Sequence, residues 1–404
     1  MRISIVAPRL ERGGLEMFML RIGRGFQLQG HQVEILLTVE KGPWFGEAAR
    51  WGLSTRCLPA ADSYSKRAHI RRIAAELTES GCDVCLLNHD PLAQAGLGLL
   101  PDRVVVIPVI HNDAPMVYKV ACANSDSWNV LVGVSDKIVQ HASSVIGTRP
   151  IIGIPNGVDA PDTIPHRGLR PQGQPLRLLF AGRLNQEQKG VLFLPLILAE
   201  CLRRGLQCTL TVAGDGPAKA ELERDFRLAG MSSKVTMLGW LDSRRVATEM
   251  READVLLLPS FHEGLPVVLL EAMANGCVPV ASRLQGITDS VAVDGQSGFL
   301  VRVGDVGGFA SAVENLARRP ELLLGMSNAA VVRTKGNFTV ECMSERYSRL
   351  IADAEAGHFP LPRSRSRQID PQLLTWRDFI PNKFLACYRR NKALYKTAVK
   401  RTSP

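Results

Sequence analysis

The chain has 404 residues, of which 46% are hydrophobic and 22% are charged. This length corresponds to two or three globular domains, which excludes a disordered protein and a small fold that depends on disulfides or a metal. The net charge is +10, but residues 361–404 hold 11 Lys and Arg against only Asp370 and Asp378. The first 360 residues are therefore nearly neutral, which excludes a body that coats nucleic acid and predicts no nucleic-acid partner.

Nine cysteines are scattered along the chain, and no run of 18 residues is uninterruptedly apolar. We therefore expect reduced thiols, a cytoplasmic location and no membrane-spanning helix. Cys82 and Cys85 form a C-x-x-C motif, but they lie in an apolar, strand-like run without a second pair. We expect them to be buried structural thiols and not a redox or metal pair.

Short β-branched runs alternate with longer helical patterns in the first half of the chain, which is typical of parallel βαβ units. The expected strands are residues 3–7, 33–37, 84–87, 104–108, 130–132 and 151–154. The expected helices include residues 15–29, 66–79 and 135–145. We interpret residues 1–168 as the first of two doubly wound, Rossmann-like α/β domains.

A proline-rich stretch, residues 159–175, is predicted to be a linker. The alternation then resumes, with expected strands at 177–180, 209–213, 234–237, 255–258, 278–281 and 298–301. Residues 169–357 are thus predicted to form a second doubly wound domain that faces the first across a cleft, with ligands bound beyond the carboxyl ends of the strands. Residues 358–404 are predicted to be a non-globular, basic extension.

The most specific motif lies in residues 253–280, where a strand leads to Glu263-Gly264 and Pro266 begins a helix that carries Glu271. A helix N-terminus favours anions, and Gly264 lets the backbone approach a phosphate. Glu271 is flanked by apolar residues, and an unpaired carboxylate is costly to bury. We expect Glu271 to bind two vicinal hydroxyls or a cation, unless it lies on the solvated face of its helix.

Two cations follow the first strand of the second domain, Arg183 at a glycine turn and Lys189 at the start of the next helix. Such a pair suits a diphosphate, because Arg is a bidentate donor and Lys a point charge. In the first domain, Gly13-Gly14 lacks the G-x-G-x-x-G spacing of nicotinamide dinucleotide sites. This turn either approaches a phosphate or an acceptor, or is an ordinary strand-to-helix connection. His111 ends an apolar strand and either acts on a sugar hydroxyl or is satisfied locally.

Several motifs, taken in order, resemble the retaining GT-B glycosyltransferases of family four, also called glycosyl transferases group 1. The resemblance covers roughly residues 1–357. It rests on Gly-Gly-x-Glu at 13–16, Pro-Asn-Gly-Val-Asp at 155–159, Gly182-Arg183 with Lys189, Ala-Gly-Asp-Gly-Pro at 213–217, Leu-Gly-Trp at 238–240, and Glu263 followed eight positions later by Glu271.

The resemblance implies a nucleoside-diphosphate sugar donor, held mainly by the second domain. It implies Arg183 and Lys189 on the diphosphate, Glu271 on the ribose hydroxyls, Glu263 near the donor sugar, Trp240 and Leu241 near the base, Gly14 near the phosphates and acceptor, and Gly264, Leu265 and Val267 among the donor-binding residues. It also implies that His111 faces the sugar, so that Glu263 and His111 are the candidate catalytic residues.

The implied activity is transfer of a hexose-type sugar, with retention, to a glycan or lipid-linked acceptor in the synthesis of cell-surface polysaccharide, lipopolysaccharide or glycolipid. No metal cofactor is expected, because the sequence has no Asp-x-Asp and Arg183 and Lys189 can offset the charge of the leaving group. Two alternatives stay open: a nucleotide-sugar epimerase of the same fold, and an inactive scaffold recruited to a membrane.

Residues 381–401, drawn as a helix, combine an apolar stripe containing aromatic residues with a cationic face. Such a helix is typical of segments that lie in an anionic membrane interface. Alternatively, the stripe packs on the enzyme body, or the segment is a nucleic-acid arm. We expect the segment to dock the enzyme peripherally on the inner face of the cell membrane.

Overall fold

A computed structural model describes residues 1–59, 65–161, 169 and 174–373. The chain divides into two compact units. Unit 1 comprises Met1–Gly133, Val139–Gly153 and the described residues from Ser344 onward, and unit 2 comprises Val134–Ile138 and Ile154–Met343. The predicted domain limits are residues 168 and 357. Apart from Val134–Ile138, the chain passes from unit 1 to unit 2 after Gly153 and returns to unit 1 at Ser344.

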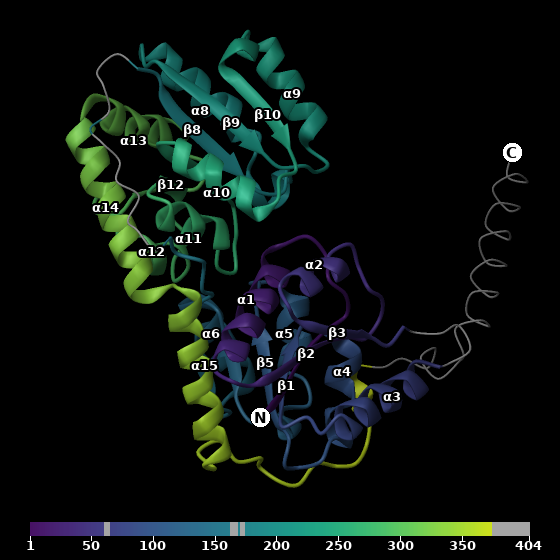
Figure 1. Ribbon diagram of the computed structural model, residues 1–404. Helices are drawn as coiled ribbons and strands as arrows, with labels where there is room; N and C mark the ends of the chain where they lie inside the picture. The colour runs from purple at the N-terminus through teal and green to yellow at the C-terminus, as the bar shows by residue number, and fades with distance from the viewer. Residues whose placement is uncertain (60–64, 162–168, 170–173, 374–404) are drawn as a thin grey trace, which may run out of the picture. The chain divides into compact units, whose positions relative to one another are not determined.

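Unit 1 is built on a seven-stranded parallel sheet with the strand order β3-β2-β1-β4-β5-β6-β7 (Figure 1). The strands are β1 (Arg2–Ala7), β2 (Gln32–Leu37), β3 (Ser54–Cys57), β4 (Val84–Asn88), β5 (Val105–Ile110), β6 (Leu131–Gly133) and β7 (Ile151–Gly153). The helices are α1 (Gly14–Leu28), α2 (Phe45–Arg50), α3 (Lys66–Glu79), α4 (Pro91–Ala95), α5 (Pro115–Ala121) and α6 (Asp136–Ile146), with 3-10 turns η1 (Leu97–Leu99) and η2 (Ser125–Ser127). The edge strand β3 is not predicted from the sequence, because Ser-Thr-Arg-Cys is short and mostly polar.

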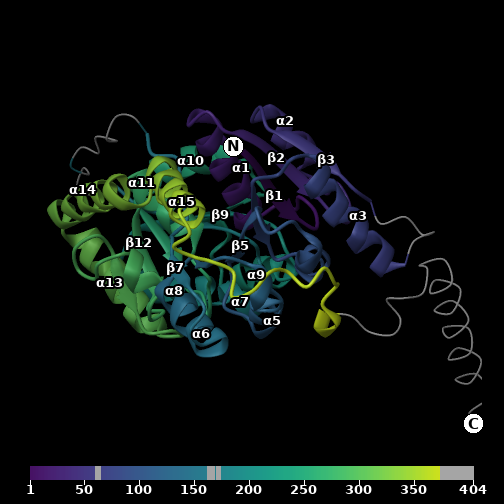
Figure 2. The same cartoon turned by 90° about the horizontal axis from the view of Figure 1, so that it is seen from below.

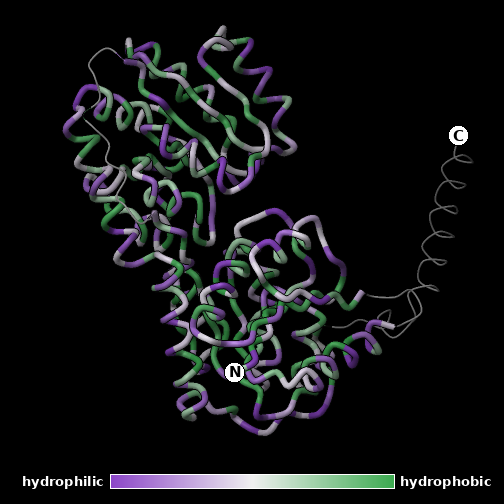
Figure 3. The backbone as a smooth tube through the Cα atoms, in the orientation of Figure 1, coloured by the Kyte–Doolittle hydropathy of each residue, from purple (hydrophilic) through white to green (hydrophobic). Residues whose placement is uncertain are grey.

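The strands of unit 1 form a sheet because apolar side chains occupy both of its faces. Every residue of β4 and of β5 is buried, as is typical of a parallel sheet covered by helices on both sides. Figure 3 shows that hydrophobic and hydrophilic stretches alternate along the backbone of the chain. Cys82 and Cys85 lie in this core, as predicted, and burial raises the pKa of both thiols.

Of the predicted non-globular extension, residues 358–404, the structure describes only residues 358–373, which follow helix α15 (Val340–Glu355) and are packed on unit 1. Residues 358–373, here called the C-terminal strap, run along unit 1 to the 3-10 turn η4 (Pro371–Leu373), which packs against α4 (Figures 1 and 2). The Arg365 side chain is only 3% exposed, and its guanidinium donates hydrogen bonds to the backbone carbonyls of Pro101, Val104 and Ser127. The strap is therefore part of the fold of unit 1, although its sequence is basic.

Unit 2 contains a six-stranded parallel sheet with the order β10-β9-β8-β11-β12-β13. Its strands are β8 (Leu176–Ala181), β9 (Cys208–Ala213), β10 (Val235–Gly239), β11 (Val255–Leu258), β12 (Val278–Ser282) and β13 (Phe299–Val301). Its helices are α7 (Gln186–Lys189), α8 (Phe193–Arg203), α9 (Lys219–Leu228), α10 (Ser243–Glu252), α11 (Val267–Ala274), α12 (Thr288–Val291), α13 (Val306–Arg318) and α14 (Pro320–Asn337), with a 3-10 turn η3 (Ser232–Lys234). Apolar residues of α8, α9 and α13 share one core with the strands.

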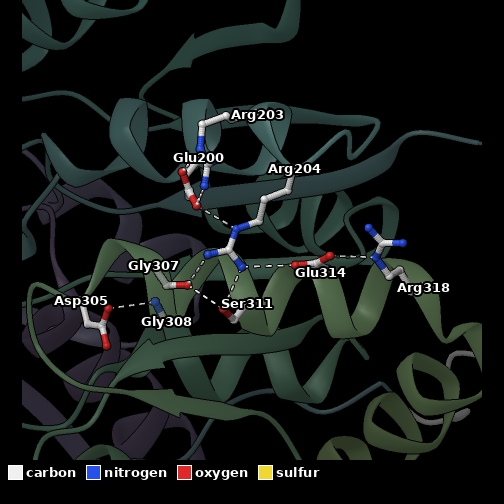
Figure 4. Close-up of polar contacts among 9 residues, drawn as sticks. All are labelled: Glu200, Arg203, Arg204, Asp305, Gly307, Gly308, Ser311, Glu314 and Arg318. Carbon is white, nitrogen blue, oxygen red and sulfur yellow. Dashed lines mark hydrogen bonds and ion pairs between the residues drawn. The ribbon is translucent and has the colours of Figure 1, made fainter.

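Helices α8 and α13 pack side by side, and Arg204 joins them at the surface (Figure 4). Its guanidinium donates to Glu200 of its own segment at 2.8 Å and to Ser311 and Glu314 of α13 at 2.8 and 3.2 Å. It also donates to the carbonyl of Gly307 in the first turn of α13. One side chain thus ties the end of α8 to two turns of the neighbouring helix.

Two features of the sequence analysis lie wholly or mostly outside the described residues. These are the amphipathic segment 381–401 and most of the proline-rich linker. Within the part of the chain that the structure describes, no helix is both long and apolar enough to cross a membrane.

Candidate active site

The loops after β8 and β11 lie together at the carboxyl edge of the sheet in unit 2, because these two strands are neighbours. The backbone N–H of Phe261, after β11, donates to the carbonyl of Gln188, after β8, at 2.8 Å. A Cβ placed on Gly190 would lie 2.2 Å from the carbonyl oxygen of Pro259. The two loops are therefore in direct backbone contact, and only glycine fits at position 190.

This contact brings together two of the predicted site residues, Lys189 and Glu263. The Lys189 ammonium donates to Glu263 Oε1 at 2.7 Å, and the Ser260 hydroxyl donates to the same oxygen at 2.7 Å. The Glu263 side chain is 5% exposed and the Lys189 side chain 15% exposed. A buried carboxylate is stable here because it is paired with a cation and hydrogen-bonded as well.

The local sequence explains how Lys189 reaches this position. Asn185 caps the one-turn helix α7, since its side-chain oxygen accepts a hydrogen bond from the N–H of Gln188 at 3.1 Å. Gly190 then ends the helix in the left-handed conformation, with φ of +60°, which is the usual role of glycine after a helix. Lys189 is predicted from the sequence to begin a helix, but it is the last residue of α7.

Helix α11 follows Glu263 and carries Glu271. Pro266 is the residue before the helix and not its first residue, because its ψ of 96° is extended. Gly264 and Leu265 are buried, whereas Val267 and Glu271 are half-buried. Glu271 therefore lies at the edge of the apolar helix face, where a carboxylate can still reach a ligand.

Glycine loops connect the carboxyl ends of β8, β9 and β10. The N–H of Gly182 donates to Ala213 at 2.9 Å, and the N–H of Gly214 donates to Gly239 at 2.7 Å. Arg183 and Trp240 come directly after two of these glycines. Both of these residues are exposed, and the Trp240 side chain is 45% exposed. Leu241, which follows Trp240, is half-buried. Among the described residues, none forms a hydrogen bond or ion pair with the Arg183 guanidinium.

The remaining predicted residues, Gly14 and His111, belong to unit 1. Gly14 is exposed and begins α1. His111 follows β5, and its Nε2 lies 2.9 Å from Asn88 Oδ1. Because the Asn88 amide group donates to the carbonyls of Val6 and Leu86, its oxygen accepts from His111 Nε2–H. Burial, together with a smaller effect of the nearby His89, lowers the pKa of His111 to about 3, so the ring is neutral at physiological pH.

Two polar contacts in unit 2 and one in unit 1 are not predicted from the sequence. Ser260, Asn185 and Asn88 each hydrogen-bond a predicted residue or cap its helix, but the sequence assigned none of them a role. A signal exists for two of them, because Ser260 lies three residues before Glu263 and Asn185 is a typical N-cap residue before a short helix. The contact between Asn88 and His111 follows only from the pairing of β4 with β5.

Residues 175–319 match the family described as Glycosyl transferases group 1. The chain contains a glycosyl transferases group 1 domain. Outside this domain the likeness continues, since the chain is 27% identical to phosphatidyl-myo-inositol mannosyltransferase of Mycolicibacterium smegmatis over 353 residues, which are 80% of this chain and 87% of the relative. It is also 30% identical to glycogen synthase of Mycobacterium tuberculosis over 248 residues, so the match spans 59% of each.

Solved structures share the architecture of two parallel sheets. HepE of Anabaena, solved in complex with UDP and glucose, superimposes with a TM-score of 0.72 at 17% sequence identity, over 87% of this chain and all of HepE. The two parallel sheets of seven and six strands are thus the GT-B fold, as the sequence analysis predicts. Lys189, Glu263 and Glu271 all lie inside the group 1 domain.

Proposed function

We propose that the chain is a retaining, metal-independent glycosyltransferase that moves a hexose-type sugar from a nucleoside-diphosphate donor to a glycan or lipid-linked acceptor. The observation that carries this proposal is the pairing of Lys189 with a buried Glu263 at the carboxyl edge of a group 1 domain. The names of two relatives, a glycogen synthase and a phosphatidyl-myo-inositol mannosyltransferase, support a glycan or lipid-linked acceptor.

In this proposal, unit 2 binds the donor. Arg183 has no partner among the described residues and offers a bidentate donor to the diphosphate, while Lys189 offers a second cation. Their positive charge stabilises the leaving diphosphate, which is the work that a metal ion performs in other transferases. Glu271 binds the ribose hydroxyls. The donor also contacts Trp240, Leu241, Gly264, Leu265 and Val267.

The transfer step follows a front-face course. The acceptor oxygen forms its bond to the anomeric carbon on the face from which the phosphate oxygen leaves, and that phosphate oxygen takes the acceptor proton. Glu263 orients the donor sugar, and neutral His111 of unit 1 hydrogen-bonds a sugar hydroxyl. Gly14 leaves room for the acceptor and the phosphates at the start of α1.

A screen of nucleotide sugars by thermal shift tests donor binding, since a ligand that binds only the folded state raises its stability. Glu271→Ala is expected to weaken donor binding severely by calorimetry and leave the melting temperature nearly unchanged. Glu221→Ala, on the exposed face of α9, is the matched control. Unchanged donor affinity in Glu271→Ala would mean that the ribose assignment is wrong.

Product analysis separates the proposed reaction from its alternatives. NMR of the product is expected to show the anomeric configuration of the donor, and activity is expected to persist in EDTA. Conversion of the donor to an epimer without an acceptor would instead indicate an epimerase. Binding without turnover in the presence of varied acceptors would indicate a scaffold.

We also propose that the enzyme works at the cytoplasmic face of an anionic membrane, through residues 381–401. The described part of the chain also carries exposed cations: α3 exposes Lys66, Arg71 and Arg72 and packs on α4, as does η4 at the end of the strap. Charges of this kind are attracted to anionic lipid headgroups.

Vesicle co-sedimentation tests the membrane proposal. The full chain is expected to pellet with vesicles of phosphatidylglycerol and phosphatidylcholine, less so at high salt, and not with phosphatidylcholine alone. The proper truncation is residues 1–373, because removal of the strap would disturb unit 1. Lys392, Lys396 and Lys400 changed to Gln form the matched charge control. Equal pelleting of the full chain and of residues 1–373 would contradict the proposal.

A further inference from the structure

Ser260 is a buried hydroxyl that lies next to the candidate site and has no role in the proposed function. It is 0% exposed and follows Pro259 directly after strand β11. Its hydroxyl donates to Glu263 Oε1 at 2.7 Å. A buried serine more commonly donates to a backbone carbonyl, as Ser327 does to Gly276 in the same unit. Ser260 is instead bonded to an ionisable side chain.

The two hydrogen bonds of Glu263 are unevenly shared between its oxygens. Oε1 accepts from both Ser260 and Lys189, whereas Oε2 accepts no hydrogen bond from any of the described residues. Because both donors bind Oε1, the second oxygen of the carboxylate stays available to a hydroxyl of a ligand. The arrangement therefore presents one defined acceptor atom.

The position of the Ser260 hydroxyl is itself fixed by the backbone on both sides of it. Pro259 contacts Gly190, and the N–H of Phe261 donates to Gln188. The Phe261 ring also packs on Phe193 with ring centroids 5.5 Å apart. Because residues 259 and 261 are both anchored to the α7 loop, Ser260 cannot shift without breaking these contacts.

Lys189 and Ser260 differ in what a donor diphosphate would do to them. A diphosphate competes with Glu263 for the Lys189 ammonium, since both are anions that bind a cation. The Ser260 hydroxyl is buried beneath Glu263 and carries no charge, so it keeps its bond to Oε1 when Lys189 turns to the phosphates. Among the described residues, Ser260 is then the hydrogen-bond donor that still holds the Glu263 carboxylate.

We propose that Ser260 is a positioning residue that holds Glu263 toward the sugar of the donor while Lys189 serves the diphosphate. This inference rests on the proposed function and deepens it, because it assigns recognition of the sugar, as distinct from the nucleotide, to one hydrogen-bonded pair. Loss of the hydroxyl should therefore affect the sugar-transfer step and spare the binding of a nucleoside diphosphate.

The test compares Ser260→Ala with the wild-type full chain, using UDP-glucose and UDP as first probes and then the donor found in the screen. We expect kcat/KM for transfer to fall on the order of tenfold to a hundredfold, mainly through kcat, as for a misplaced reacting group. The affinity for the nucleoside diphosphate, measured by calorimetry, should stay within about twofold. Ser327→Ala is the matched control and should change neither value.

Two further variants keep the test decisive if Ser260→Ala folds poorly. Ser260→Thr retains the hydroxyl and should restore most of the activity, while Ser260→Cys retains the size with a weaker donor and should fall between serine and alanine. Transfer in Ser260→Ala equal to wild type, or an equal loss of diphosphate affinity and transfer, would overturn the inference and leave the proposed function standing. Absence of donor binding and transfer in the wild-type chain would overturn both.

Discussion

Gly190 holds the turn that carries Lys189, and two separate costs oppose any side chain there. Its φ is +60°, and a Cβ would lie 2.2 Å from the backbone oxygen of Pro259. Gly205 offers a matched comparison, because its φ is +76° but no atom lies within 4 Å of an added Cβ. Backbone strain is thus common to both positions, and the close contact is specific to Gly190.

We predict that Gly205→Ala lowers the free energy of unfolding by about 1–2 kcal/mol, the cost of the left-handed conformation for a residue with a Cβ. Gly190→Ala should cost more than this, because the loop after β11 must also move. It should also weaken donor binding, since Lys189 and Glu263 lie on the two displaced loops. Chemical denaturation and calorimetry measure the two effects, and equal stability losses would contradict the close contact seen here.

The second feature at the scale of single residues is the neutral state of the His111 ring. The unfolded chain protonates this ring near pH 6.5, but in the folded state its pKa is about 3. His111 therefore favours folding less and less as the pH falls from about 6.5 toward about 3. We predict that its imidazole NMR signals do not titrate between about pH 8 and 5. A titration midpoint near 6.5 would show that the ring is not buried as described.

At the scale of elements, the ion-pair network between α8 and α13 gives unit 2 a defined response to acid. Hydrogen bonds from Arg203 and Arg204 lower the pKa of Glu200 to about 2, against 4.5 for an ordinary glutamate. Stabilisation by Glu200 is therefore complete above about pH 4.5 and is lost as the pH falls toward about 2. The carboxylate is exposed to solvent, so salt should also weaken the network.

We predict that Glu200→Gln lowers the stability of unit 2 at pH 7 and that the difference from wild type shrinks below about pH 4.5. Urea denaturation at several pH values measures this difference. Glu221→Gln, which removes an exposed pair with Arg224 on α9 alone, is the control and should change little. A difference from wild type that stays constant as the pH falls would mean that Glu200 is not held by the two arginines.

The helices and strands could be predicted from the sequence better than the contacts between them, and individual elements show why. Helix α3 matches the predicted residues 66–79 because Ser65 caps it, accepting from the N–H of Ala68 at 3.2 Å. The buried strands of both sheets follow from apolar runs bounded by turns. The contact between Lys189 and Glu263 spans 74 positions, and sequence periodicity contains no information about such a pairing. Sequence reasoning therefore identified both residues but not Ser260 between them.

At the scale of the whole molecule, two arginines of the basic C-terminal strap are held in two different ways. The strap uses Arg363 in an ion pair with Asp126, and it buries Arg365 against backbone carbonyls. Burial lowers the pKa of Arg365 to about 10, so the group is still cationic at neutral pH. Charge alone predicts exposure, which is why the sequence analysis places these residues in a non-globular extension. The carbonyls that accept from Arg365 precede β5 and β6, at the opposite edge of the sheet from His111.

We predict that residues 1–357 are less stable than residues 1–373 by roughly 3 kcal/mol, because the carbonyls of residues 101, 104 and 127 lose a charged donor. For a unit of this size the loss corresponds to roughly 6–12 °C in melting temperature. Arg365→Ala in the full chain should reproduce most of the loss, whereas Arg363→Ala, an exposed pair, should cost about 0–1 kcal/mol. Thermal melts measure the loss, and hydrogen exchange in β5 and β6 locates it in unit 1. Equal melting temperatures and exchange rates for residues 1–357 and 1–373 would show that the strap contributes nothing to unit 1, and residues 1–357 would then serve equally well as the truncation for vesicle binding.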